Sequence, residues 1–128
     1  MKKKLILIAE DDAFLTKLYT LSLSDDTIDV VAAKDGAEAI RRIHSQEPDL
    51  LILDLLMPKV DGFAVLEFIR KQNYRFPTVV LTNLKQRNDE KKCLDLGASH
   101  FLSKSDMDLD KLKATIHEML GIVRAKKK

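Results

Sequence analysis

Carboxylates that follow two apolar runs are the residues in this chain best suited to chemistry. The first run ends at Ala9 and is followed by Glu10 and Asp11, while the second, Leu50–Leu53, is followed directly by Asp54. Unbroken apolar runs of this kind are typical of strands that are buried on both faces of a parallel sheet. Because clustered like charges repel one another, these acids need a compensating partner, and a hard cation is the natural candidate.

Polar residues also follow two later apolar runs. Thr82 and Asn83 come after Thr78–Leu81, and Lys104 closely follows the run His100–Leu102. The carboxyl ends of parallel strands lie on the same edge of a sheet, so these residues should converge there with the acids. The expected site therefore contains carboxylates, a hydroxyl group and one ammonium group, with no His or Cys nucleophile nearby.

This set of groups favours phosphoryl transfer. Oxygen atoms of Glu10, Asp11 and Asp54 suit Mg²⁺, which prefers one or two carboxylates together with water and phosphate oxygens. Asp54 is central, so its carboxylate can act as a nucleophile toward phosphorus. Phosphoryl transfer needs mainly positioning and charge neutralisation, and Mg²⁺, Lys104 and the Thr82 hydroxyl could each contact one phosphoryl oxygen. The expected product is an aspartyl phosphate.

Strands and helices that could position these residues alternate along the chain. We expect strands near Lys4–Ala9, Asp29–Ala32, Leu50–Leu53, Thr78–Leu81 and His100–Leu102, and helices near Ala13–Leu23, Gly36–His44, Phe63–Lys71, Gln86–Leu96 and Leu109–Val123. Such alternation predicts an α/β fold with a parallel sheet, right-handed crossovers and helices on both faces. Asp29–Ala32 is the least apolar strand and should lie at an edge. The last helix has one apolar face, which should pack on the sheet rather than form a coiled coil.

Composition predicts one globular domain. The chain has 128 residues, 45% of them hydrophobic and 33% charged, with a net charge of +2 that is too small to argue for nucleic-acid binding. We expect a single domain over 1–128, with a core of about 3–120 and a solvated basic tail at 124–128. Cys93 is the only cysteine, and neither a transmembrane segment nor a signal peptide is evident, which favours a cytoplasmic location.

Three stretches of the sequence resemble the receiver domain of two-component response regulators, in the CheY-like superfamily. They are Ile6–Asp12, Asp54–Gly62 and Gly97–Lys104, and the resemblance extends over roughly residues 3–120. The family has an acidic pair after the first strand, a phosphoacceptor Asp after the third, Thr or Ser after the fourth and Lys after the fifth. Here those positions match Glu10-Asp11, Asp54, Thr82 and Lys104.

The resemblance implies a fold and a set of site residues. The fold would be doubly wound and flavodoxin-like, with a five-stranded parallel sheet in the order 2-1-3-4-5 flanked by five helices. Asp11, Asp54 and the backbone carbonyl of Leu56 would bind Mg²⁺ directly, while Glu10 would act through water. Asp12 receives no ligand role.

The resemblance also implies a signalling function without a separate substrate to turn over. A sensor histidine kinase or a phosphotransfer protein would donate its phosphoryl group to Asp54. Thr82 would then move toward that group, the switch aromatic Phe101 would turn inward, and the face of the fourth helix, fifth strand and fifth helix would change its affinity for a downstream protein or output domain. Phosphorylation acts in this way by adding charge and shifting a two-state equilibrium. A phosphorylation-dependent homodimer is compatible with this scheme, and direct binding to nucleic acid or membrane is not expected.

Several residues depart from the family pattern. Ser105 stands where the family usually has Pro after a cis bond, so the loop either keeps a strained cis bond or is trans, with Lys104 reaching the site differently. Asn83 is bulkier than the small residue common at its position. Leu56 and Leu84 occupy the two positions thought to tune hydrolysis; both are apolar and cannot orient an attacking water, which predicts slow self-dephosphorylation.

Three other functions have weaker support in the sequence. A degenerate receiver that binds partners without phosphorylation rests only on Ser105 and Asn83. A phosphatase similar to the haloacid dehalogenases needs a second Asp two residues after the nucleophile, where this chain has Leu56. A flavodoxin-like cofactor module needs a cradle rich in Ser, Thr and Gly for phosphate, which the loops after the first and third strands lack.

Overall fold

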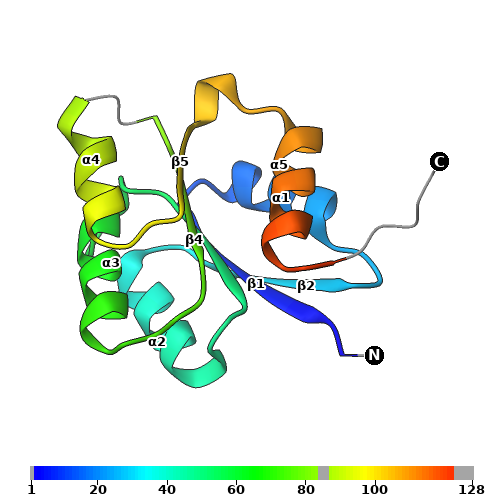
Figure 1. The fold of residues 1–128 in the computed structure, drawn as a ribbon, viewed down its shortest axis with the longest axis horizontal. Coiled ribbons are helices and arrows are strands. Elements are labelled where there is room, and N and C mark those ends of the chain that lie inside the picture. Colours follow the sequence, from blue (N-terminus) through cyan, green and yellow to red (C-terminus); the bar gives the residue numbers. More distant parts are fainter. Residues whose placement is uncertain (1, 84–86, 123–128) are drawn as a thin grey trace.

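The computed structural model describes residues 2–83 and 87–122 of the chain, and they alternate between strands and helices (Figure 1). The strands are β1 (Lys4–Ala9), β2 (Ile28–Ala33), β3 (Leu50–Leu53), β4 (Thr78–Thr82) and β5 (His100–Ser103). The helices are α1 (Ala13–Leu23), α2 (Gly36–Gln46), α3 (Gly62–Lys71), α4 (Arg87–Asp95) and α5 (Leu109–Met119), with a short 3₁₀-helix at Lys104–Asp106. The alternation predicted from the sequence is confirmed.

All five strands pair in parallel, in the order β2-β1-β3-β4-β5. The predicted fold class is therefore confirmed, and β2 lies at an edge as expected. The register places Ala9 opposite both Ala33 and Leu53, while Thr82 lies opposite Ser103. Because the strands end nearly level, the loops that follow β1, β3, β4 and β5 all leave from the same edge of the sheet.

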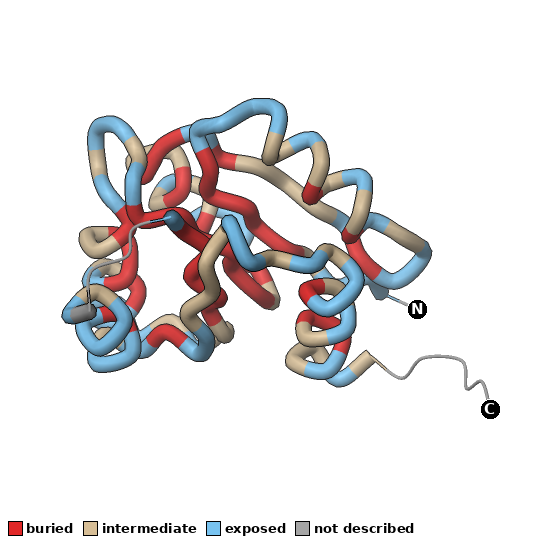
Figure 2. Tube along the Cα trace, turned by 90° about the horizontal axis from the view of Figure 1, so that it is seen from above, coloured by how far each residue is buried: buried red, intermediate tan, exposed pale blue. Residues whose placement is uncertain are grey.

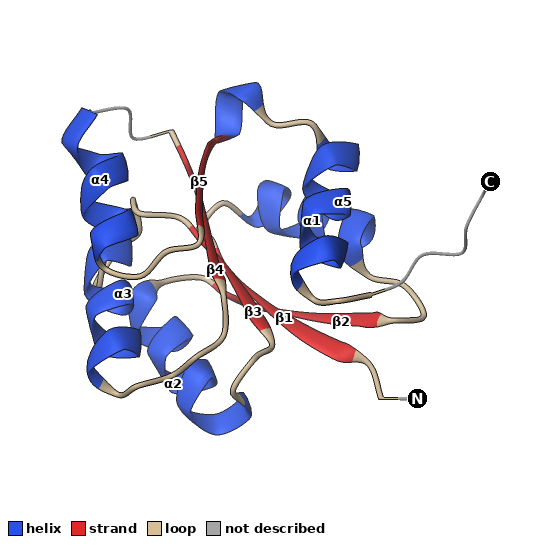
Figure 3. Cartoon of the chain, in the orientation of Figure 1, coloured by secondary structure: helices blue, strands red, loops and turns tan. Residues whose placement is uncertain are grey.

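Helices cover both faces of this sheet (Figure 3). The buried apolar side chains form two clusters, one beneath α2, α3 and α4 and the other beneath α1 and α5. Buried residues follow the strands and the inner sides of the helices (Figure 2). Leu112 and Ile116 of α5 lie in the second cluster, which confirms that its apolar face packs on the sheet. No helix in the described part of the chain is both long and apolar enough to span a membrane.

Local signals explain where several helices begin and end. Asp12, Asp61 and Asp108 each accept backbone N–H groups at the start of α1, α3 and α5, respectively. Asp108 alone caps α5, because Asp106 lies in the preceding 3₁₀-helix. Gly97 adopts a φ of 106° and donates to Leu94 O, which closes α4 in a Schellman motif.

The end of α5 differs from the sequence prediction. The helix was expected to reach Val123, which lies outside the described residues, but it ends at Met119. Leu120 is its C-cap, and Gly121 follows with a φ of 70°. A residue in the left-handed region cannot continue a helix, so local backbone geometry, rather than the apolar pattern, sets this boundary.

Packing of α5 on the sheet predicts a large difference between two leucine substitutions. Leu112 is 2% exposed, whereas Leu21, on the outer side of α1, is 71% exposed. Leu112→Ala should lower the free energy of unfolding by about 2–5 kcal/mol, because it leaves a cavity in the core. The matched control Leu21→Ala should change it by less than about 0.5 kcal/mol. Urea denaturation of the two variants checks this, and equal effects would contradict the packing described here.

Candidate functional site

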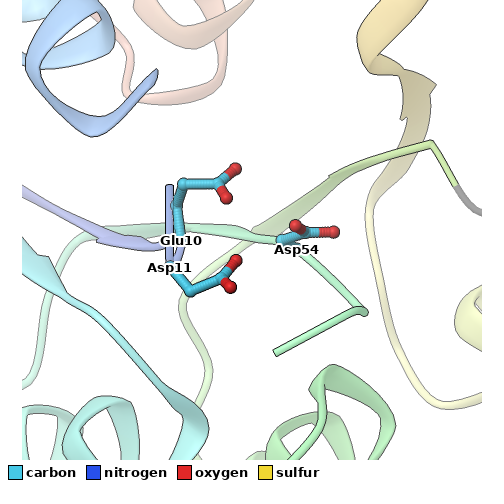
Figure 4. A group of neighbouring side chains, drawn as sticks. All are labelled: Glu10, Asp11 and Asp54. Atoms are coloured by element: carbon cyan, nitrogen blue, oxygen red, sulfur yellow. The ribbon is translucent and has the colours of Figure 1, made fainter. Parts of the chain in front are cut away.

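Three carboxylates from two different loops meet at the carboxyl edge of the sheet (Figure 4). Glu10 and Asp11 follow β1 and Asp54 follows β3, and one oxygen from each lies within 4.8 Å of the others. Glu10 and Asp54 are each 4% exposed, while Asp11 is exposed to solvent. Two of the acids are therefore held inside the protein and the third faces outward.

Backbone groups fix the buried acids in place. Glu10 Oε2 accepts a hydrogen bond from the N–H of Asp12 at 3.1 Å, and Asp54 Oδ1 accepts one from the N–H of Leu56 at 3.3 Å. The carboxylate of Asp12 is engaged instead with the first amides of α1. Asp12 therefore serves as the N-cap of α1.

Lys104 supplies the positive charge of the site. Its Nζ lies 2.8 Å from Asp54 Oδ2 and 2.6 Å from Glu10 Oε1, and its side chain is 13% exposed. The Lys104–Ser105 peptide bond is trans, since the described residues contain no cis bond. The structure thus decides between the two alternatives for this loop: it is trans, and Lys104 still reaches both acids. Beside it, the hydroxyl groups of Ser103 and Ser105 lie 2.9 Å apart.

Burial and pairing act in opposite directions on the ionisable groups here. Burial raises the pKa of Glu10, although the hydrogen bond from Lys104 and the amide of Asp12 act to lower it. Burial would lower the pKa of Lys104, but its hydrogen bonds to Asp54 and Glu10 outweigh that effect and the pKa is raised. Lys104 is therefore a firmly charged ammonium group, held by two carboxylates.

The donor set fits a divalent cation. Three carboxylates and one ammonium group leave two negative charges uncompensated, and all the available donors are hard oxygens, which Mg²⁺, Mn²⁺ and Ca²⁺ favour. Asp11 also borders a surface hollow of about 310 Å³. Leu56, whose backbone carbonyl is the other expected ligand, lines the same hollow.

The structure shows where most of the remaining predicted residues lie. Thr82 ends β4, is fully buried and pairs in register with the residue before Lys104. Phe101 is partly buried and packs against the cluster beneath α2, α3 and α4. Asn83 is exposed, and Leu84 lies outside the described residues.

Tyr19 is a neighbour of the site that the sequence did not reveal. It is 1% exposed, and burial raises its pKa to about 12, with smaller effects from the charges of Lys104, Glu10 and Asp54. Its phenol therefore lies within the electrostatic reach of the acidic cluster. The only sequence signal was an aromatic residue on the inner side of α1, and core tyrosines are common at such positions.

Sequence comparisons relate this chain to one family of proteins. The model described as the response regulator receiver domain matches residues 6–117. The alkaline phosphatase synthesis transcriptional regulatory protein PhoP of Bacillus subtilis is 36% identical over 104 residues. The match covers 81% of this chain and 43% of PhoP, so it spans less than half the length of that relative.

Two solved structures resemble this chain in fold. The BeF₃-activated N-terminal receiver domain of RstA from Klebsiella pneumoniae is 30% identical, with a TM-score of 0.83 and coverage of 91% of this chain and 97% of that one. The Mn²⁺-bound form of response regulator Rcp1 is 28% identical, with a TM-score of 0.81 and coverage of 97% and 99%.

The contacts of Lys104 predict a pH-dependent stability defect in Lys104→Met. Two buried carboxylates would lose their counter-charge, which should lower the free energy of unfolding by about 3–5 kcal/mol at pH 7. Burial already raises the pKa of Glu10 above 4.5 in the folded protein, so protonation favours folding. The defect should therefore be largest at neutral pH and should shrink as the pH falls toward 4.5. Urea denaturation across this pH range measures it.

Lys113→Met is the matched control for this substitution. Lys113 lies 3.6 Å from Asp25, and its side chain is 33% exposed, so its loss should cost less than about 1 kcal/mol. The pKa of Asp25 is lowered, first by the hydroxyl of Thr27, so the stability that Asp25 contributes is lost as the pH falls. A defect in Lys104→Met that is as small as in the control, and constant with pH, would contradict the counter-charge role.

Proposed function

This chain belongs to the family of response regulator receiver domains, and we propose that Asp54 is the residue modified in its phosphorylation-dependent signalling switch. The observation that carries the proposal is the contact of Lys104 with both buried acids, which assembles the phosphoacceptor, the acidic pair and the cationic group at one point. Asp54 is central in this arrangement. It is buried and fixed in position, and its carboxylate lies within 4.8 Å of that of the exposed Asp11.

In the proposed transfer, an oxygen of the Asp54 carboxylate attacks the phosphorus of a phosphohistidine. The new O–P bond forms as the N–P bond breaks, and the electron pair of that bond returns to the imidazole, which leaves and takes up a proton. Lys104 is ion-paired with the carboxylate beforehand and is placed to contact a phosphoryl oxygen afterwards. Asp11, Asp54, the Leu56 carbonyl and, through water, Glu10 would hold Mg²⁺, which neutralises charge on the transferred group.

Thr82 and Phe101 are the proposed switch residues. Thr82 ends β4 at the same edge of the sheet as Asp54, and Phe101 lies on the neighbouring strand β5. A phosphoryl group adds roughly −1.5 to −2 charges and several acceptor oxygens, which would draw the Thr82 hydroxyl toward the site. The change would be read at the surface of α4, β5 and α5 by a downstream protein or output domain, or by a second copy of the chain.

The proposed partners follow from this chemistry. The phosphodonor is a sensor histidine kinase or a phosphotransfer protein. We propose no nucleic-acid contact by this domain itself, since its net charge is only +2, and no separate substrate that it turns over. The location we propose is cytoplasmic, in keeping with a single, buried and unpaired cysteine, Cys93.

Phosphorylation is tested by intact mass after incubation with acetyl phosphate. The wild-type chain should gain one phosphoryl group in the presence of Mg²⁺ and none in EDTA. Asp54→Asn should gain none. Asp61→Asn is the matched control, because Asp61 is an exposed N-cap nearby and Asn also caps well. No phosphoryl addition to folded wild-type protein, with no response to beryllium fluoride, would favour a phosphorylation-independent interaction module instead.

The lifetime of the aspartyl phosphate depends on whether a side chain can orient water. Leu56 is 53% exposed beside Asp54 and offers no hydrogen-bonding group. The wild-type phosphoprotein should therefore decay slowly, over minutes or longer. Leu56→Gln should accelerate decay by roughly 3- to 10-fold, because an amide can position the attacking water. Leu94→Gln, at a leucine of α4 that is 43% exposed, should leave the decay unchanged. Wild-type decay within seconds, measured by intact mass over time, would refute slow hydrolysis.

A further inference from the structure

The turn between β2 and α2, Ala33–Gly36, contacts both halves of the metal site although it supplies no ligand. On one side, the N–H of Glu10 donates to the carbonyl of Ala33 at 3.0 Å. On the other side, Asp35 and Gly36 contact the loop between β3 and α3. The turn therefore lies between the loop after β1, which carries Glu10 and Asp11, and the loop after β3, which follows Asp54. Its position affects the distance between these two loops.

Reciprocal hydrogen bonds make this turn rigid. Asp35 Oδ1 accepts from the N–H of Glu38 at 2.8 Å, and Glu38 Oε1 accepts from the N–H of Lys34 at 2.9 Å. Each side chain thus satisfies an amide near the other at the start of α2, much as in a capping box. The backbone N–H of Glu38, by donating to the Asp35 carboxylate, also lowers the pKa of Asp35, which keeps this cap charged. The start of α2 is a fixed surface rather than a mobile loop.

Gly36 allows the β3–α3 loop to press against this fixed surface. A Cβ at Gly36 would overlap the carbonyl oxygen of Val60 and would lie 2.6 Å from its carbonyl carbon. Both clashes are with backbone, so no side-chain rotation could relieve them. The preceding residue, Lys59, has a φ of 69°, and its Nζ lies 3.7 Å from Asp35 Oδ2. The loop is therefore held against α2 at two successive residues.

We infer that Gly36 and Asp35 are positioning residues for the metal site, an inference that rests on the proposed function. The loop that they hold also carries Leu56, whose carbonyl is a proposed ligand, and it follows Asp54 directly. Mg²⁺ demands nearly ideal octahedral geometry, so displacement of this loop by a fraction of an ångström weakens binding. The turn thus sets the distance between the ligands of the β1 loop and those of the β3 loop.

Metal affinity measured without phosphorylation tests this inference. Mn²⁺ serves as the probe, and its free concentration is followed by the electron paramagnetic resonance signal of the aquo ion. Gly36→Ala should bind Mn²⁺ about tenfold more weakly than the wild type, as is typical when residues that support metal ligands are changed. Ile43→Val is the matched control in the same helix; Ile43 is fully buried but lies in the core, and this variant should bind Mn²⁺ as the wild type does.

A second variant covers the case in which Gly36→Ala does not fold, as judged by circular dichroism. Val60→Gly makes the loop backbone more flexible at the same contact without introducing a clash, and it should weaken Mn²⁺ binding roughly threefold. Its control, Ala64→Gly in α3, should not. Wild-type affinity in a folded Gly36→Ala protein, or in Val60→Gly if the former is unfolded, would overturn the positioning role and leave the proposed function intact. Failure of the wild-type chain to bind Mn²⁺ would overturn the metal site and this inference together.

Discussion

The balance of charge at the carboxyl edge of the sheet is the constraint on which the rest of the site depends. Glu10 and Asp54 are buried, and both contact a single ammonium group, that of Lys104. A buried charge is tolerated only when it is paired and hydrogen-bonded, so Lys104 makes the arrangement compatible with a folded protein. With Asp11 included, two negative charges remain uncompensated. That residual charge creates the demand for a divalent cation, and the same cation can then neutralise an incoming phosphoryl group.

Parallel pairing of the strands is what allows charged groups from distant parts of the sequence to meet. Glu10 and Lys104 are far apart in the chain, yet both follow strands that end at the same edge. The interiors of β1, β3 and β4 are almost wholly apolar and buried, so the polar residues of the site lie at or beyond the ends of the strands. A rigid core thus carries the site. In the proposed switch, the Lys104 side chain and the Thr82 hydroxyl would turn toward a phosphoryl group while the backbone of the sheet stays in place, which is the property that a two-state switch requires.

Support for the site comes from residues that have no chemistry of their own. Gly36 contributes only the absence of a side chain, which lets the backbone of Val60 approach the start of α2. Gly62 acts similarly, because a Cβ there would lie 2.6 Å from the carbonyl oxygen of Asp54 itself. These close approaches show that backbone contacts hold the loop after β3 at two points, although it lies at the surface and carries a proposed metal ligand. Precise placement of an oxygen ligand depends on such packing.

The sequence by itself determined the strands, the order of the elements and the identity of the acids, because apolar periodicity and strand-end residues are local features that survive without tertiary context. It predicted β1, β3 and α1 to the residue, and it placed Glu10, Asp11, Asp54 and Lys104 at one edge. It missed the end of α5, where the left-handed conformation of Gly121 stops a helix that the apolar pattern would have continued.

Only the tertiary structure decided how Lys104 reaches its partners. With Ser105 in place of the usual Pro, the sequence allowed either a cis or a trans peptide bond after Lys104. The trans bond, together with the ion pairs of Lys104 to Glu10 and Asp54, depends on contacts between β1, β3 and β5. Likewise, nothing local to Gly36 or Tyr19 indicates that either lies near the site. The close approach of the Val60 backbone reveals the role of Gly36. The effect of the charges of the site on the Tyr19 phenol reveals that Tyr19 is a neighbour of the site. These relationships arise between segments distant in sequence, and only the packing of the folded chain brings them together.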